Sequence, residues 1–384
     1  MFKTVFAADI GSKCIKCVAR GQVAAEETAI ALEAGAKLTV AAAGNAALLH
    51  RSGVIRPVRD GAAANTRMLA LLLGRLACEK TGKRTTASIE LHAAIPHMLP
   101  TVKQNALKQA ARLAGFRALQ VHDPLLMGAI GADADLFSDR AHMIVNIGAE
   151  TMTCAAFANG GMLWQGFSNE GSAAVDRAIQ NWFRDEHRLL IGERMAEIIK
   201  QNLNKLSFDI EGRSADDGLP QTVRANGAEL RAAAQKGQTA LIRFVKDAVK
   251  ALQPEAAADL LDTGITLIGG GALQFGLAEC FSRELPEIPI LTAKNAVTAV
   301  ADGMNAVILK KKAGLRHSKN CLPKSGQCVP QRLLPKLRCD LYIHKQLKTS
   351  AVPCLRGCRC LFCNIQFNAP SGESFLAGLT GLRN

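Results

Sequence analysis

The chain has 384 residues, a length that predicts two to three domains. Hydrophobic residues make up 48% of it, which excludes wholesale disorder. The net charge of +14 would by itself suggest nucleic acid or an anionic membrane surface as a partner. Nine of these charges and seven of the 12 cysteines fall in residues 313–384, whereas residues 1–312 carry a net charge of only +5. The body therefore has an ordinary composition, and its charge argues neither for nor against nucleic acid.

The N-terminal sequence carries no signal-peptide pattern, and no run of eighteen apolar residues occurs. We therefore expect a cytoplasmic protein with reduced thiols.

The first half alternates segments with strand and helix periodicity. Strands are predicted at 3–8, 14–20, 88–95 and 118–121, and helices at 62–78, 101–114 and 124–131. Thr101 is expected to cap the second of these helices and Gly115 to end it. The Ala-rich segment 21–55 is expected to hold short strands and a helix near 45–50.

The second half follows a similar plan. Strands are predicted at 143–147, 154–158, 162–167, 265–268 and 288–291, and helices at 173–183, 193–203, 227–252 and 295–311, with one more after residue 271. The polar stretch 206–224 is expected to form short strands at best. Because each half opens with a strand, a glycine turn and a strand, we expect an internally repeated α/β fold with two domains facing across a cleft.

Two of these turns have the composition of phosphate-binding loops. Asp9, Gly11, Ser12 and Lys13 lie in the first, and Asn146, Gly148 and Thr151 in the second. Backbone N–H groups of tight turns bind anions, and a hydroxyl or a Lys adds a donor. Asp9 could hold Mg²⁺ through its water shell. Gly269, Gly270 and Gly271 follow a third strand and would let a flat ligand approach the backbone.

Six segments together resemble the actin-like ATPases, and most closely the MreB family. They are ADIGS at 8–12, IRPVRDG at 55–61, VHDPL with GAIG at 121–131, VNIG at 145–148, LIGE with AEIIK at 190–200, and LIGGGAL at 267–273. The resemblance covers about residues 3–312 and implies an actin-like (ribonuclease H-like) fold with duplicated domains around a nucleotide cleft. It implies domain I at 1–145 with a small subdomain at 21–60, and domain II at 146–294 with a small subdomain at 180–257. The helix at 295–312 is expected to pack back on domain I.

The resemblance also assigns roles to residues. It implies ATP and Mg²⁺ as ligands, with the two turns on the phosphates and Asp9 as the Mg²⁺ partner through water. The glycine triplet would lie at the adenosine, with Lys200 and Gln201 near the ribose. Asp123 would be the catalytic carboxylate that orients the attacking water.

Four residues depart from the family pattern. The family has Asp at the position of Asn146, glycine at Ala149 and Glu150, and Glu at Asp123. Because phosphoryl transfer depends on positioning and charge neutralisation, we expect nucleotide binding with slow or absent hydrolysis, a weak ATPase at most. Glu150 would repel phosphate unless it turns outward or meets a cation.

The function implied is a cytoskeletal ATP-binding protein that self-associates into filaments and directs cell-wall synthesis and rod shape. Its partners would be the cell-wall elongation machinery and the inner membrane face, with no nucleic acid. The alternatives are a non-hydrolysing scaffold that binds partners, a small-molecule kinase of the same superfamily, and a chaperone-type ATPase domain. The preferred interpretation of the segment 79–86 is a solvated loop. Any membrane contact through its Lys80, Lys83 and Arg84 would be electrostatic.

The segment 313–384 has no counterpart in the family and no sustained period. Cys354, Cys358, Cys360 and Cys363 could bind zinc, but their spacing is not that of a standard zinc ribbon, so no zinc site is predicted. Its basic residues could instead bind nucleic acid. The preferred interpretation is a disordered extension or the product of a reading-frame change.

Overall fold

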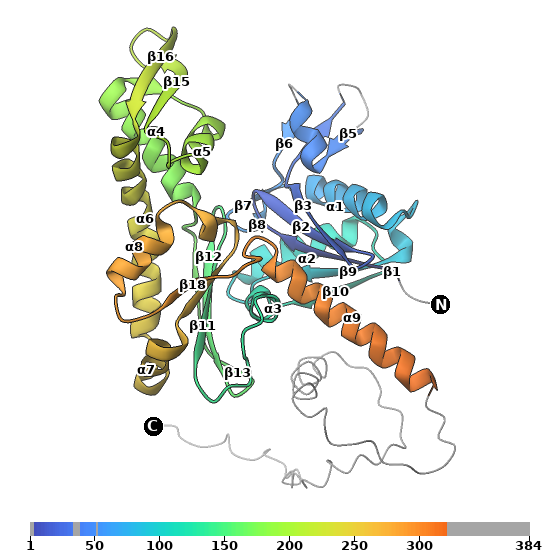
Figure 1. The fold of residues 1–384 in the computed structure, drawn as a ribbon. Helices are drawn as coiled ribbons and strands as arrows, with labels where there is room; N and C mark the ends of the chain where they lie inside the picture. Colours follow the sequence, from blue (N-terminus) through green and yellow to red (C-terminus); the bar gives the residue numbers. More distant parts are fainter. Residues whose placement is uncertain (1–3, 34–38, 51–52, 321–384) are drawn as a thin grey trace, which may run out of the picture. The chain divides into compact units, whose positions relative to one another are not determined.

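The computed structural model describes residues 4–33, 39–50 and 53–320, with side chains up to residue 310 (Figure 1). The predicted tail lies outside these residues from 321 onward. The elements of the first half are β1 Thr4–Ile10, β2 Cys14–Ala19, β3 Gln22–Glu27, β4 Ile30–Leu32, β5 Val40–Ala43, the 3₁₀ helix η1 Gly44–Leu49, β6 Val54–Ile55, β7 Val58–Arg59, β8 Ala62–Ala63, α1 Thr66–Thr81, the 3₁₀ helix η2 Thr86–Ser88, β9 Ile89–Ala94, α2 Thr101–Leu113, β10 Ala118–His122 and α3 Pro124–Gly131.

The second half continues the alternation of strands and helices. Its elements are β11 His142–Ile147, β12 Met152–Ala158, β13 Gly161–Ser168, α4 Ala173–His187, β14 Leu189–Leu190, α5 Glu193–Gln201, β15 Ser207–Ser214, β16 Pro220–Asn226, α6 Gly227–Lys250, α7 Pro254–Thr263, β17 Ile265–Ile268, the 3₁₀ helix η3 Gly270–Leu273, α8 Leu277–Glu284, β18 Ile290–Thr292 and α9 Ala299–Asn320.

Two mixed sheets share one topology, which confirms the predicted repeat. The first has the order β10-β9-β1-β2-β3 and the second the order β18-β17-β11-β12-β13. In each, an antiparallel meander leads to two parallel strands, because β1 pairs in parallel with β9 and β11 with β17. Both glycine turns therefore follow the central strand of a sheet and lie at equivalent places.

The core beside the first sheet forms where the apolar face of β1 packs against the apolar face of α1. Phe6 and Ala8 alternate toward one face of β1 and pack with Leu69, Leu72 and Leu76 of α1, all of them buried. A strand exposes alternate residues to one face, and a helix brings together residues three or four apart. Burial of these side chains fixes the end of β1, and with it the first glycine turn.

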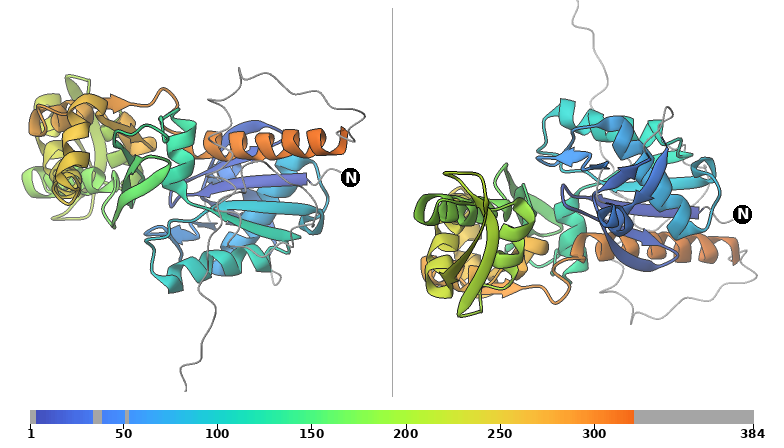
Figure 2. Two further views of the ribbon diagram at one scale, coloured as in Figure 1. Left: turned by 90° about the horizontal axis from the view of Figure 1, so that it is seen from below. Right: turned by 90° about the horizontal axis from the view of Figure 1, so that it is seen from above.

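The last helix returns to the first half of the chain. α9 contacts β1, β2 and β3, and it crosses α3 so closely that backbone meets backbone (Figures 1 and 2). A Cβ atom on Gly131 would collide with the carbonyl oxygen of Ala299, and one on Gly303 with that of Met127. Glycine at both positions permits this approach.

Several local predictions were wrong. The stretch 206–224 forms a regular hairpin of β15 and β16, in which Phe208 and Ile210 face inward between exposed neighbours. The helix α7 was missed. Helix α2 has no side-chain cap, since Thr101 is its first residue and Pro100 precedes it. Helix α1 begins later than predicted, because the Asn65 side chain accepts a hydrogen bond from the Met68 amide.

Candidate functional site

The first glycine turn leaves backbone donors available. It joins β1 to β2, and a Cβ atom on Gly11 would lie only 2.7 Å from the carbonyl oxygen of Cys14. Among the described turn and loop hydrogen bonds, none uses the amides of Gly11, Ser12 or Lys13 as donor. The Ser12 hydroxyl oxygen accepts from the Gly61 amide at 3.1 Å, so its own proton remains for another acceptor. The turn can thus offer several donors to one anion.

The second turn is closed by a bond from the Gly148 amide to the Thr151 carbonyl oxygen at 2.9 Å. The amides of Ala149, Glu150 and Thr151 donate in no described turn or loop bond. Gly171 lies against this turn, where a Cβ atom would come 2.6 Å from the carbonyl oxygen of Ala149 and 2.7 Å from the amide nitrogen of Thr151. Glycine at 171 therefore holds the turn in shape.

The segment around β7 bridges the two turns. Besides its bond to Ser12, Gly61 lies close to the second turn, since a Cβ atom there would be 3.2 Å from Cγ2 of Thr151. The neighbouring Asp60 amide donates to the Glu150 carboxylate at 2.6 Å. The structure therefore brings the two predicted turns together and directs Glu150 toward Asp60.

Asp9 has a cationic neighbour that sequence reasoning missed. It pairs directly with Lys16 across the β1–β2 ladder, and the Lys16 ammonium lies 3.4 Å from Oδ2 of Asp9. Side chains opposite each other in an antiparallel pair lie on the same face. The length of the turn could have located this pair, because a three-residue turn at 11–13 sets the strand register that places Lys16 opposite Asp9.

Helix α5 connects the first turn with one of the predicted adenosine residues. Lys13 forms an ion pair with Glu197, and the Gln201 amide group donates to the other oxygen of Glu197 at 3.2 Å. Glu197 was not predicted, although it belongs to the AEIIK segment. It joins two candidate site residues from opposite halves of the body.

Lys200 is buried and holds α5 to the start of α4. Its ammonium lies 2.7 Å from Oδ2 of Asp176 and 3.3 Å from the carbonyl oxygen of Ser172. Burial lowers the pKa of Lys200 and raises the pKa of Asp176, and in both cases it outweighs the mutual attraction of the pair. The predicted ribose contact of Lys200 stays a prediction.

The glycine triplet lies beside the second turn. Gly269 adopts a φ of 87°, its amide donates to the Ala296 carbonyl oxygen at 2.7 Å, and a Cβ atom on it would meet the Asn146 side-chain oxygen at 2.5 Å. Nothing lies within 4 Å of a Cβ atom on Gly270. The triplet is therefore positioned next to Asn146.

Asp123 has a structural role that accounts for its position. One carboxylate oxygen accepts from the amides of Leu125 at 2.9 Å and Leu126 at 3.0 Å, which caps α3. The other lies 3.9 Å from Nε2 of His97. Its role in orienting a water molecule stays a prediction.

The donor set does not fit Mg²⁺ well. Asn146 supplies no charge, Glu150 binds the Asp60 amide, and Asp9 already faces the ammonium of Lys16. Within the described residues, no group of three His, Cys, Asp or Glu side chains could hold a metal ion.

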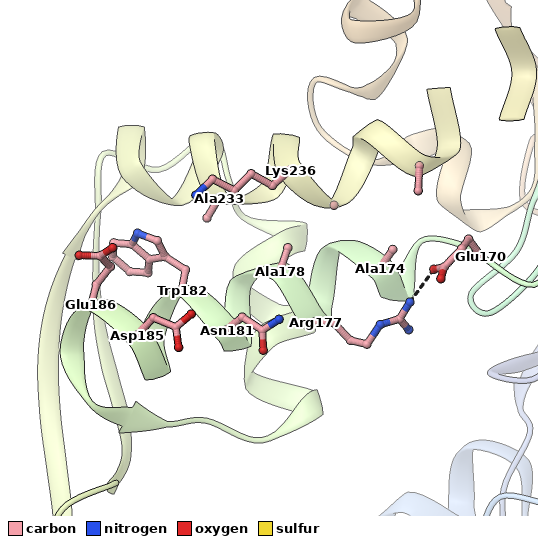
Figure 3. A pocket seen from close by; sticks show the side chains of 12 residues that line it. Glu170, Ala174, Arg177, Ala178, Asn181, Trp182, Asp185, Glu186, Ala233 and Lys236 are labelled. Carbon is pink, nitrogen blue, oxygen red and sulfur yellow. Dashed lines mark hydrogen bonds and ion pairs between the residues drawn. The ribbon is translucent and has the colours of Figure 1, made fainter. Parts of the chain in front are cut away.

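A separate groove of about 410 Å³ runs between α4 and α6. Figure 3 shows Trp182 on α4 and Lys236 on α6 at its wall, and Arg177 paired with Glu170 at 2.6 Å. It contains none of the predicted site residues.

The two glycine turns, the triplet and most of α9 fall within one family profile. The MreB/Mbl protein profile matches residues 3–315. The chain belongs to the MreB/Mbl family. It is 29% identical to the cell shape-determining protein Mbl of Bacillus subtilis over 261 residues, which covers 66% of this chain and 78% of that protein. It is 28% identical to the cell shape-determining protein MreB of Escherichia coli over 322 residues, covering 79% and 92%.

Solved structures that are similar to this chain confirm an actin-like fold. MreB5 of Spiroplasma citri bound to AMPPNP superposes with a TM-score of 0.73 at 22% identity, covering 83% of this chain and 99% of that one. The MamK double helical filament gives a TM-score of 0.65 at 20% identity, covering 80% and 99%.

Proposed function

We propose that this MreB/Mbl protein binds an adenine nucleotide between its two glycine turns. The observation that carries the proposal is the bridge at Gly61, which brings two sets of available backbone amides together. Family membership supports it, and so does the AMPPNP bound to the similar MreB5. In this arrangement the turns would hold the phosphates and the triplet at 269–271 the adenosine, in a body divided into domains 1–145 and 146–294.

Hydrolysis would be slow or absent. Asn146 lacks the carboxylate of the family, and the Asp123 carboxylate caps a helix. The Glu150 carboxylate is directed to the Asp60 amide, an arrangement that would lessen its repulsion of the phosphates. The sequence predicts Mg²⁺ beside Asp9, whereas the Asp9–Lys16 pair argues for a different counter-charge.

We infer from the family that the protein self-associates into filaments and acts in cell-wall synthesis and rod shape. The similar MamK forms a double helical filament, which supports self-association. No described helix is long and apolar enough to cross a membrane. A peripheral membrane contact would rest on Lys83 and Arg84, because Lys80 lies in α1 and pairs with Glu26.

The test is nucleotide binding by the full chain, measured by calorimetry with ATP, ADP and AMPPNP. Gly171→Ala pushes a methyl group into the second turn and should weaken binding about tenfold or more, while Gly192→Ala meets nothing within 4 Å and should leave it unchanged. Binding that neither variant alters would refute the site. Sedimentation and electron microscopy then show whether nucleotide promotes filaments, and phosphate release distinguishes a weak ATPase from a non-hydrolysing scaffold.

Membrane contact needs a separate measurement. Co-sedimentation with anionic vesicles should decrease as salt rises, because exposed charges more than about 10 Å apart are screened at 0.1 M salt. Binding that persists at high salt would contradict an electrostatic contact.

A further inference from the structure

We propose that the ammonium of Lys16 takes the place of Mg²⁺ beside Asp9, so that this chain binds its nucleotide without a divalent metal. The inference rests on the proposed nucleotide site and concerns how that site neutralises the phosphate charge. It assigns to Lys16 a binding role that the sequence did not suggest.

The position of Lys16 is the first support. Its ammonium lies 3.4 Å from Oδ2 of Asp9, and the two side chains are only 14% and 16% exposed. The antiparallel register holds them opposite each other, next to the turn that contains Gly11. A Cβ atom on Gly11 would itself lie 3.7 Å from this ammonium, so the charge is held close to the available amides of the turn.

The space beside Asp9 is the second support. Mg²⁺ requires near-octahedral geometry and keeps several waters, so an aspartate that holds it through water needs room for that shell. At Asp9 the ammonium of Lys16 lies 3.4 Å from Oδ2, on the oxygen to which a water of this shell would bind. A divalent cation would also be repelled by the ammonium at such a short distance.

The charges of the other turn are the third support. Asn146 is neutral, and the carboxylate of Glu150 is engaged by the Asp60 amide. Lys13 is paired with Glu197, so Lys16 is the lysine of the first hairpin that faces Asp9. Three donors of a lysine ammonium can serve Asp9 and phosphate oxygens at once. The residues present thus favour an organic cation over a metal.

The experiment compares ATP affinity of the full chain in Mg²⁺ and in excess EDTA. The expected result is equal affinity in both conditions. Lys16→Met keeps the stem and removes the charge, and it should weaken binding in EDTA about tenfold, the effect of losing one charge-assisted hydrogen bond. Lys16→Arg keeps the charge and should keep binding independent of metal. The exposed Lys205→Met is the matched control and should bind as the parent does.

A direct readout of metal separates the outcomes. Mn²⁺ added with ATP should show the resonance spectrum of the free Mn–ATP complex, not that of an ion held by the protein. Affinity lost in EDTA, or a protein-bound Mn²⁺ signal in the parent chain, would overturn the role of Lys16 while leaving nucleotide binding intact. Absence of nucleotide binding in both conditions would overturn the proposed function and this inference together. Unchanged EDTA affinity in a folded Lys16→Met variant, checked by circular dichroism, would also refute it.

Discussion

The ion pair of Lys200 and Asp176 offers a sharp test of how the α4–α5 region is held together. The two charged groups lie 2.7 Å apart with side chains 11% and 13% exposed. Lys200→Met removes the cation and leaves the carboxylate of Asp176 buried, with its Oδ1 already lacking a partner among the described residues. Breaking a buried pair on one side costs about 3–5 kcal/mol, so the unfolding transition in urea should shift strongly to lower concentrations.

Replacing both partners should cost far less. Burial shifts the pKa values of both groups toward their neutral forms, which indicates that loss of hydration exceeds the attraction of the pair. The double variant Lys200→Met with Asp176→Leu leaves no buried charge and should recover most of the stability. A residual loss of about 0.3–1 kcal/mol is expected, because Asp176 lies in the first turn of α4 and interacts with the helix dipole.

The assay is urea unfolding followed by circular dichroism, with a surface pair as control. Lys246 and Glu284 lie 2.8 Å apart but are 35% and 48% exposed. Lys246→Met should leave the transition midpoint nearly unchanged, because exposed pairs are hydrated and screened. If Lys200→Met shifts the midpoint no more than this control does, or if the double variant is as unstable as the single one, the reasoning from burial is wrong.

Three further predictions concern the scaffold of the site. Gly303→Ala should destabilise the body by about 1–3 kcal/mol, because its methyl group collides with the carbonyl oxygen of Met127. Gly74→Ala inside α1, whose methyl group would meet its nearest atom at 3.7 Å, should not destabilise it, and denaturant unfolding compares the two variants. Asp123→Ala should lower the free energy of unfolding by about 0.5–2 kcal/mol through loss of the α3 cap, whereas Asp123→Asn should keep the cap. If Asp123 also orients water, Asp123→Asn should lose residual phosphate release without a loss of stability. Burial raises the pKa of Asp176 above 3.8, so the folded state keeps the carboxyl proton of Asp176 to a higher pH than the unfolded state does. The free energy of unfolding should therefore fall as pH rises from 3.8, and it should fall less in Asp176→Asn.

Much of the fold could be predicted because its signals are local. The periodicity of α1 and the run of β1 follow from residues within one segment, and the paired glycine turns mark the repeat. The hairpin of β15 and β16 could not be predicted this way. Its few inward residues, such as Phe208 and Ile210, are buried by side chains of α4, α5 and α6, so their burial depends on how these helices pack and not on the strand pattern alone.

In the candidate site too, some features follow from local sequence and others from packing between segments. Asp9, Ser12 and Thr151 could be named from turn composition, since available amides and hydroxyls are properties of the turns themselves. The meeting of Ser12 and Thr151 at Gly61, and the close fit of Gly171 against the second turn, depend on how distant segments pack.

The sequence by itself determined the family, the two turns and the departures at Asn146, Glu150 and Asp123. Only the tertiary structure decided which partners the charged groups at and near these positions meet. Glu150 turns to the Asp60 amide, Asp123 caps α3, and Lys16 faces Asp9. A residue type fixes which charges and donors a position can offer, but the partner that meets them is chosen by strand register and by packing between segments far apart in the chain.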